Sequence, residues 1–253
     1  MIMHKIKMLA CAALGLSCLT GPALAQARSD AAFQITPYVW AMGVGGDITP
    51  FTGAPTVAVD ASFADLLEDL DAAFFVSAYA RQGDLVFLGD FSTSSSSRSG
   101  VTPSPPAPAA LPATGTLRQT SITALVGSRV MTTPDATVDL LAGFRHWNVK
   151  GGVAVPLIPA AATRSRSFTD PVIAARANFQ IAPDWSALAY ADVGGFGVGS
   201  ERTAQLLGTV NYRWRDNTFV SVGYRALQMD YRDGGTRFDV RMGGPVLGVT
   251  FRF

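Results

Sequence analysis

The sequence has few of the residues that build covalent or metal-bound frameworks. Among its 253 residues are two cysteines, Cys11 and Cys18, and two histidines, His4 and His146. Both cysteines and His4 lie in an N-terminal segment that we expect to be removed. The remaining chain then has neither a disulfide nor a thiolate metal site. No cofactor, metal site or catalytic residue is predicted.

Charged residues are also scarce, at 15% of the chain, where roughly 25% is usual for a soluble protein. Two of the 20 basic residues, Lys5 and Lys7, fall in the N-terminal segment, which leaves 18 against 19 acidic ones. This balance offers no basic excess for nucleic acid. No run reaches the roughly 18 consecutive apolar residues of a spanning helix. If the chain meets a membrane, it must cross it with another architecture.

The N-terminus has the three parts of an export signal. Lys5 and Lys7 precede an apolar core of 13 residues, MLACAALGLSCLT, and Ala23-Leu24-Ala25 precedes Gln26. A basic start, an apolar core and a small-x-small site are typical of a cleavable secretory signal. We expect residues 1–25 to be a signal peptide and residues 26–253 to form one domain.

Beyond the signal, hydrophobic residues recur with the period of two that is typical of strands. From Thr203 to Trp214 one face is apolar and the other is polar. A soluble sandwich or a lipocalin-like barrel would show the same alternation with its apolar face inward. Strands of 10 to 14 residues with aromatics such as Tyr212, Trp214 and Phe251 near their ends favour a membrane barrel, whose aromatic girdles lie at both interfaces.

The pattern of turns predicts the number of strands. Short turns at 81–84, 133–135, 182–184 and 215–217 alternate with five longer connections. We therefore predict an all-β, closed antiparallel transmembrane barrel of about ten strands, with eight or twelve as alternatives. The expected strands are 32–44, 71–82, 84–95, 116–131, 136–150, 168–181, 185–198, 202–214, 218–231 and 236–253.

The longest connections are predicted to be surface loops, near 45–70, 95–115 and 151–168. In the first, Ser62 and Asp65 have capping-box spacing, and a short helix is expected over 62–70. This helix could plug the barrel mouth, but a helical turn packed on the rim is preferred. The second loop is rich in serine and then proline, which favours an extended, solvated tip.

If the apolar face meets lipid, the opposite face lines the lumen. That face carries a predicted charge network of Asp90, Arg129, Asp139, Arg145, Arg176, Asp192, Arg213 and Arg225. Arginine and aspartate side chains can form bidentate, charge-assisted pairs, and a barrel of this size is nearly filled by such side chains. A salt-bridged core that closes the lumen is therefore preferred over a narrow path for small anions.

The last strand places an apolar stripe of Leu247, Val249, Phe251 and Phe253 on the lipid face. Asp239 and Arg241 have the same parity. Either a bulge at Gly243-Gly244-Pro245 exchanges the two faces, or these charges lie above the membrane on an extended strand.

The sequence shows no combination of residues that is typical of a catalytic site. By parity His146 points outward beside Phe144, and the residue two positions later is Asn148 rather than a serine. No combination of a His–Asp pair with a second acidic pair is visible, and no glycine loop opens a helix. We therefore predict that the protein is not an enzyme.

Several segments resemble a family of small, mostly uncharacterised outer-membrane β-barrel proteins of Gram-negative bacteria, related to the opacity-type surface antigens. The resemblance is carried by YVWAMGVGGDI, SFADLLEDLD, DVGGFGVGS, GYRALQMDY and GPVLGVTFRF. It implies an outer-membrane location with membrane lipid as partner. It also implies insertion by the barrel-assembly machinery, for which the C-terminal stripe ending at Phe253 resembles the recognition signal.

The expected role is that of a structural or surface-interaction protein with a largely closed lumen. A narrow anion-preferring channel is the first alternative, and a lipid-acting outer-membrane enzyme is the second.

Overall fold

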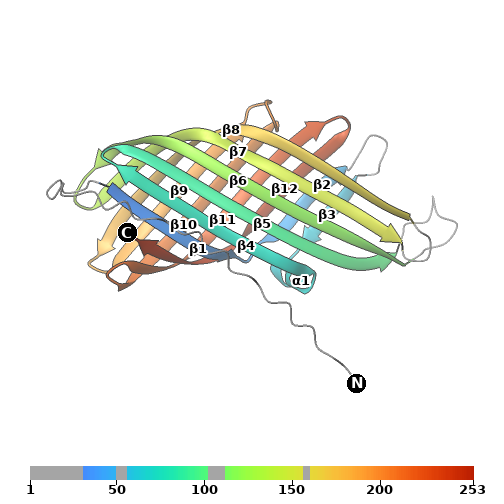
Figure 1. Ribbon diagram of the computed structural model, residues 1–253, viewed down its shortest axis with the longest axis horizontal. Coiled ribbons are helices and arrows are strands. Elements are labelled where there is room, and N and C mark those ends of the chain that lie inside the picture. The colour runs from blue at the N-terminus through green and yellow to red at the C-terminus, as the bar shows by residue number, and fades with distance from the viewer. Residues whose placement is uncertain (1–30, 50–55, 102–111, 156–159) are drawn as a thin grey trace, which may run out of the picture.

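A computed structural model shows an elongated barrel of tilted antiparallel strands (Figure 1). It describes residues 31–49, 56–101, 112–155 and 160–253. The expected signal peptide, residues 1–25, lies outside these ranges.

The barrel wall has ten strands, each hydrogen-bonded to its neighbours, and β1 pairs with β12 to close it. They are β1 (Ala31–Trp40), β4 (Leu70–Gln82), β5 (Leu85–Val101), β6 (Pro112–Thr132), β7 (Ala136–Val155), β8 (Ala160–Ala182), β9 (Trp185–Gly195), β10 (Arg202–Arg215), β11 (Thr218–Asp233) and β12 (Thr236–Arg252). The predicted fold class and the ten-stranded barrel are confirmed.

Two additional strands and one helix follow β1. The strands β2 (Gly43–Thr49) and β3 (Val57–Ala61) form a hairpin, and α1 (Phe63–Glu68) leads into β4. The backbone N–H of Ser62 donates to Asp65, whose own N–H donates to the Ser62 hydroxyl, so the predicted capping box is present. Within the described ranges no helix is long and apolar enough to cross a membrane.

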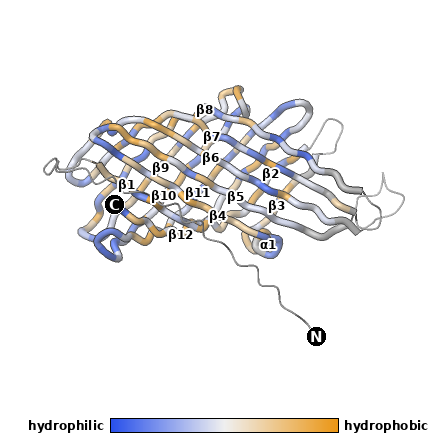
Figure 2. Tube along the Cα trace, in the orientation of Figure 1, coloured by the Kyte–Doolittle hydropathy of each residue, from blue (hydrophilic) through white to orange (hydrophobic). Residues whose placement is uncertain are grey.

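The outer surface of the barrel is apolar over its short-turn half. On β10, Leu206, Val210 and Tyr212 are exposed, whereas Thr203 and Gln205 are buried in the interior. Figure 2 shows hydrophobic and hydrophilic residues alternating along the strands near the C-terminus, with paler colours toward the far ends of β6 to β8. A belt of exposed apolar side chains is stable only against an apolar solvent.

Several strands continue past this belt, and the predicted loops are correspondingly shorter. β5 pairs with β6 as far as Val101, and β7 pairs with β8 as far as Val155. Residues 45–49 and 57–61 were also expected to be loop but form most of the β2–β3 hairpin. The expectation was wrong because these segments are short and rich in glycine and alanine, which are weak strand formers, so their own composition does not indicate strands.

β12 keeps an unbroken register with β11 from Phe251 to Thr236. The alternative with a bulge at residues 243–245 is therefore wrong. Asp239 and Arg241 lie where β12 has left β1 and pairs instead with β2. They share the outward face of the strand but lie beyond the apolar belt.

Strand β9 ends at Gly195, earlier than the predicted residue 198. Gly195, Phe196 and Gly197 all have positive φ, at 90°, 50° and 73°. Strand geometry cannot accommodate these angles, so the chain turns here and returns as β10.

Candidate functional site

The barrel interior contains three groups of ionised side chains. In the first, Asp139 on β7 is fully buried and accepts hydrogen bonds from Arg129 Nε at 2.8 Å and from Arg176 Nη1 at 3.2 Å. Tyr79 donates its hydroxyl to the same carboxylate at 3.0 Å. The Arg176 guanidinium also stacks over the Tyr79 ring, 4.2 Å from its centroid. One carboxylate therefore joins β4, β6, β7 and β8.

The second group is centred on Arg145 of β7, whose side chain is 1% exposed. Its two terminal nitrogens donate to the two oxygens of Asp192 on β9, and its Nε donates to Thr123 at 3.0 Å. Tyr190 donates to Asp192 at 2.8 Å. This bidentate pair connects strands on either side of β8.

The third group crosses the barrel from β11 to β5. Arg225 donates to Asp90 Oδ1 at 3.3 Å and to Gln205 Oε1 at 2.7 Å. It also donates to the hydroxyl of Tyr38, which donates in turn to Asp90 Oδ2 at 2.8 Å. The guanidinium lies 4.6 Å from the centroid of Trp40. Cation, carboxylate and tyrosine form one hydrogen-bonded network across the lumen.

Seven of the eight residues predicted to form the lumenal charge network lie in these three groups: Asp90, Arg129, Asp139, Arg145, Arg176, Asp192 and Arg225. Arg213 does not. It lies at the short-turn rim with its side chain 44% exposed, 3.8 Å from Asp184. Its position in the alternation of β10 is an inward one, but it lies two residues before the end of the strand, at the rim of the barrel. Tyr38, Tyr190 and Gln205 belong to the groups and were not singled out from sequence, since neutral polar residues carry no pairing signal.

Above these groups, on the long-loop side, the lumen is occupied by apolar side chains. Phe168 stacks on Tyr231 with ring centroids 4.2 Å apart, and Trp147 and Phe238 extend the stack at 6.4 and 5.7 Å. We call these four residues the aromatic layer. Further buried residues pack with Trp147, Phe168 and Tyr231 in one cluster: Trp40, Phe75, Leu227, Met229, Val240, Met242 and Val246.

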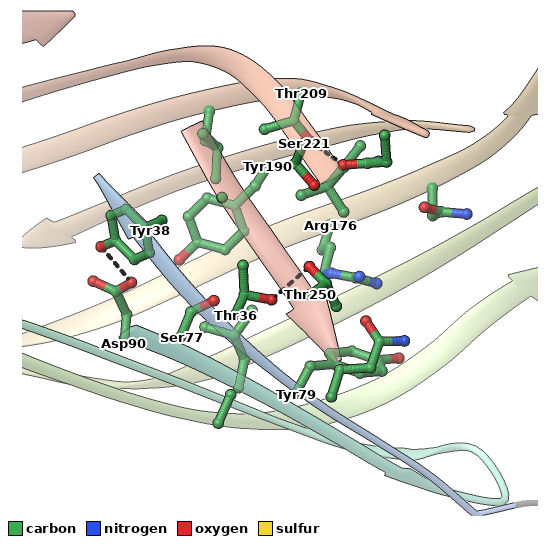
Figure 3. Close-up of a pocket in the computed structure, with 18 of the residues that line it drawn as sticks. Thr36, Tyr38, Ser77, Tyr79, Asp90, Arg176, Tyr190, Thr209, Ser221 and Thr250 are labelled. Carbon is green, nitrogen blue, oxygen red and sulfur yellow. Dashed lines mark hydrogen bonds between the residues drawn. The ribbon is translucent and has the colours of Figure 1, made fainter. Parts of the chain in front are cut away.

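Below the aromatic layer lies a pocket of about 360 Å³. It is lined by all ten barrel strands, and Figure 3 shows Tyr38, Tyr79, Arg176 and Thr250 pointing into it from different sides. The lining extends to Arg81 and Arg252, which lie near the short-turn ends of β4 and β12. The pocket therefore reaches the mouth of the barrel at the end where the short turns lie.

The residues of the proposed C-terminal signal lie on the outer surface. Leu247, Phe251 and Phe253 are 57%, 42% and 73% exposed, and Val249 is half-buried on the same face. The ring of Phe253 packs against Phe33 of β1 at 5.9 Å between centroids, and its backbone N–H donates to the Phe33 carbonyl at 2.8 Å.

His146 lies on the outer surface, as its parity predicts. Its Nδ1 is 2.8 Å from the Thr169 hydroxyl and its Nε2 is 3.1 Å from the Ser167 hydroxyl, both on the neighbouring strand β8. The serine was missed from sequence because it comes from the adjacent strand rather than from two residues along. In a hydrolytic triad with His146 as base and Ser167 as nucleophile, a third group would have to orient the histidine. Here the group that contacts the other ring nitrogen of His146 is the Thr169 hydroxyl. Within the described ranges no group of three or more possible metal ligands gathers.

No family model matches this sequence, and no curated protein matches it. Similar folds occur among solved structures. The outer membrane protease OmpT from Escherichia coli is 9% identical, with 89% of this chain and 98% of that chain covered and a TM-score of 0.53. The translocator domain of the autotransporter NalP from Neisseria meningitidis is 12% identical over 89% of this chain and 90% of that one, with a TM-score of 0.48.

The attachment invasion locus protein Ail of Yersinia pestis, in complex with a heparin analogue, is 14% identical over 88% of this chain and 98% of that one, with a TM-score of 0.39. These proteins include a protease, a translocator and an attachment protein. The likeness to OmpT supports the barrel fold and assigns no activity to this chain.

Proposed function

We propose that this chain is an integral outer-membrane β-barrel protein whose lumen is closed to solute flow, with a structural or surface-interaction role. The observation that carries this proposal is the aromatic layer with its apolar surroundings, which fills the lumen between the pocket and the long-loop end.

Contacts between strands that are not neighbours in the sheet support the closure. Phe168 on β8 meets Tyr231 on β11 beyond the ends of the shorter strands β9 and β10, which pair with β8 and β11 only as far as Val172 and Asp230. Gln119 on β6 donates its amide to the sulfur of Met242 on β12, at 3.9 Å, from the other side of the barrel. Trp147 and Tyr231 are 1% and 4% exposed, so the layer is closely packed. Ions cross a dry, apolar constriction poorly.

An outer-membrane location is supported by the outward apolar belt and by the class of the solved barrels that share the fold. The surface role is supported by the strands beyond the belt. The four strands β5 to β8 and the β2–β3 hairpin present polar, extended surfaces outside the membrane region, where a partner could pair or pack.

Planar-bilayer recordings of the purified protein test the closure. The wild type is expected to give no stable conductance. The double variant Trp147→Ala, Phe168→Ala removes two rings from the aromatic layer and should produce measurable steps. Phe144→Ala is the matched control, because Phe144 is 47% exposed on the outer surface of the same strand. Steady anion-selective steps in the wild type would instead favour the narrow channel.

A further inference from the structure

The pocket below the aromatic layer has an excess of positive charge. Six arginines line it, Arg81, Arg129, Arg145, Arg176, Arg225 and Arg252, with Asp90 as the single lining carboxylate. The fully buried Asp139 and the adjacent Asp192 also neutralise lining arginines. Three aspartates therefore pair with four of the six lining arginines, and the other two are Arg81 and Arg252.

The unbalanced charge is concentrated at the short-turn end. Asp139 is shared between Arg129 and Arg176. Arg81 donates to the backbone carbonyl of Gly83 at 2.8 Å. Arg252 lies 4.5 Å from the centroid of the Phe219 ring. Among the described residues, neither Arg81 nor Arg252 forms an ion pair with a carboxylate.

Arg252 lies among like charges. The charged side chains that act on it are the guanidiniums of Arg176 and Arg213. Guanidiniums placed close together without an intervening carboxylate repel one another, and an anion between them removes that repulsion. The fork of the guanidinium also fits two oxygens of a phosphate or carboxylate at once.

Neutral hydrogen-bonding groups surround these arginines. Thr36 on β1 and Thr250 on β12 share a hydrogen bond of 2.8 Å. Thr250 comes two residues before Arg252 on β12. Ser77 and Asn178 contribute further donors to the lining. Figure 3 shows Thr36, Ser77 and Thr250 turned toward the same space as Arg176. Hydroxyl and amide donors can hydrogen-bond the oxygens that the arginines leave free.

We propose that this pocket binds a small oxyanion of the phosphate class, which enters from the short-turn end of the barrel. Arg252 and Arg176 contact the anion. In the hydrogen-bonded pair Thr36–Thr250, the hydroxyl that accepts from its partner donates its own proton to one of the remaining oxygens of the anion. The pocket is blind, because the aromatic layer closes its other end. Binding at this site does not depend on whether the lumen conducts, so the two proposals are tested separately.

The test is calorimetric titration of the full mature protein in a neutral detergent with inorganic phosphate, in a phosphate-free buffer of low ionic strength. Saturable binding is expected for the wild type. Arg252→Gln should weaken it at least tenfold. The Arg252 side chain has no ion pair with a described carboxylate, so this replacement should leave the fold intact.

Arg215→Gln is the matched control. It removes an arginine from the same end of the barrel whose guanidinium lies over the Trp214 ring, 4.8 Å from its centroid, and which does not line the pocket. It should change phosphate affinity less than threefold. The proposal is overturned if wild-type protein shows no saturable binding, or if Arg252→Gln and Arg215→Gln bind phosphate equally well.

Discussion

Asp139 is the carboxylate that neutralises two lumenal arginines, Arg129 and Arg176. Its carboxylate accepts four hydrogen bonds, two from Arg129 and one each from Arg176 and Tyr79. Asp139→Asn keeps the shape but removes the charge, and it turns an amide NH₂ toward the guanidinium donors. Two lumenal cations then lack a counterion.

Breaking a buried ion pair by removing one partner costs about 3 to 5 kcal/mol. The side chains of Arg129 and Arg176 are 14% and 12% exposed, so water can partly solvate them. We therefore expect the lower end of the range, about 3 kcal/mol, which corresponds to about a hundredfold change in the unfolding equilibrium.

Urea unfolding of the protein in lipid vesicles, followed by tryptophan fluorescence and by the gel mobility of the folded barrel, measures this loss. Asp184→Asn is the control, because the Arg213–Asp184 pair is 44% and 54% exposed and exposed pairs contribute about 0 to 1 kcal/mol. Adding Arg129→Met to Asp139→Asn should restore part of the stability. Equal losses in Asp139→Asn and Asp184→Asn would refute the reasoning.

Three further predictions concern the wall and the outer surface. Deleting Phe253 should lower the amount of folded protein in the outer membrane of an expressing host, measured by heat-modifiable gel mobility; unchanged levels would remove its assembly role. His146→Ala should leave the host's lipid A acyl pattern unchanged in mass spectra, whereas an altered pattern would revive a lipid-acting enzyme. Gly143→Ala should lower the unfolding free energy by about 1 to 3 kcal/mol, because its Cβ would lie 2.1 Å from the Ala124 carbonyl oxygen. Gly151→Ala, which meets no atom within 4 Å, should be neutral in the same assay.

The barrel could be predicted because lipid imposes a strict pattern on the residues that face it. Within the belt every second residue must be apolar, so strands such as β10 and β11 were located to within a residue or two. Outside the belt the outward face of a strand also meets water, so the contrast that marks a lipid-facing strand is lost. In this region the glycine-rich β2 is a strand because it pairs with β12 and β3, and the serine-rich end of β5 is a strand because it pairs with β6. Their own composition does not favour strands.

The charged members of the lumenal groups share the inward parity of their strands, but parity does not tell which of them pair with one another. Arg145 reaches across β8 to Asp192, and Arg225 reaches across the lumen to Asp90. These partners depend on the tilt and stagger of the closed sheet, which no local pattern reveals. Arg213 has the same inward parity, but it lies near the short-turn end of β10 and its side chain is 44% exposed.

The way in which β12 pairs has a consequence for the order of folding. β12 is hydrogen-bonded to β11 on one edge, and on the other edge it is hydrogen-bonded first to β1 and then to β2. The outer hairpin, which lies early in the chain, cannot obtain this partner until β12 has arrived. Closure of the wall and ordering of the hairpin should then be a single late event. A change that weakens β12 would leave both ends of the barrel incomplete together.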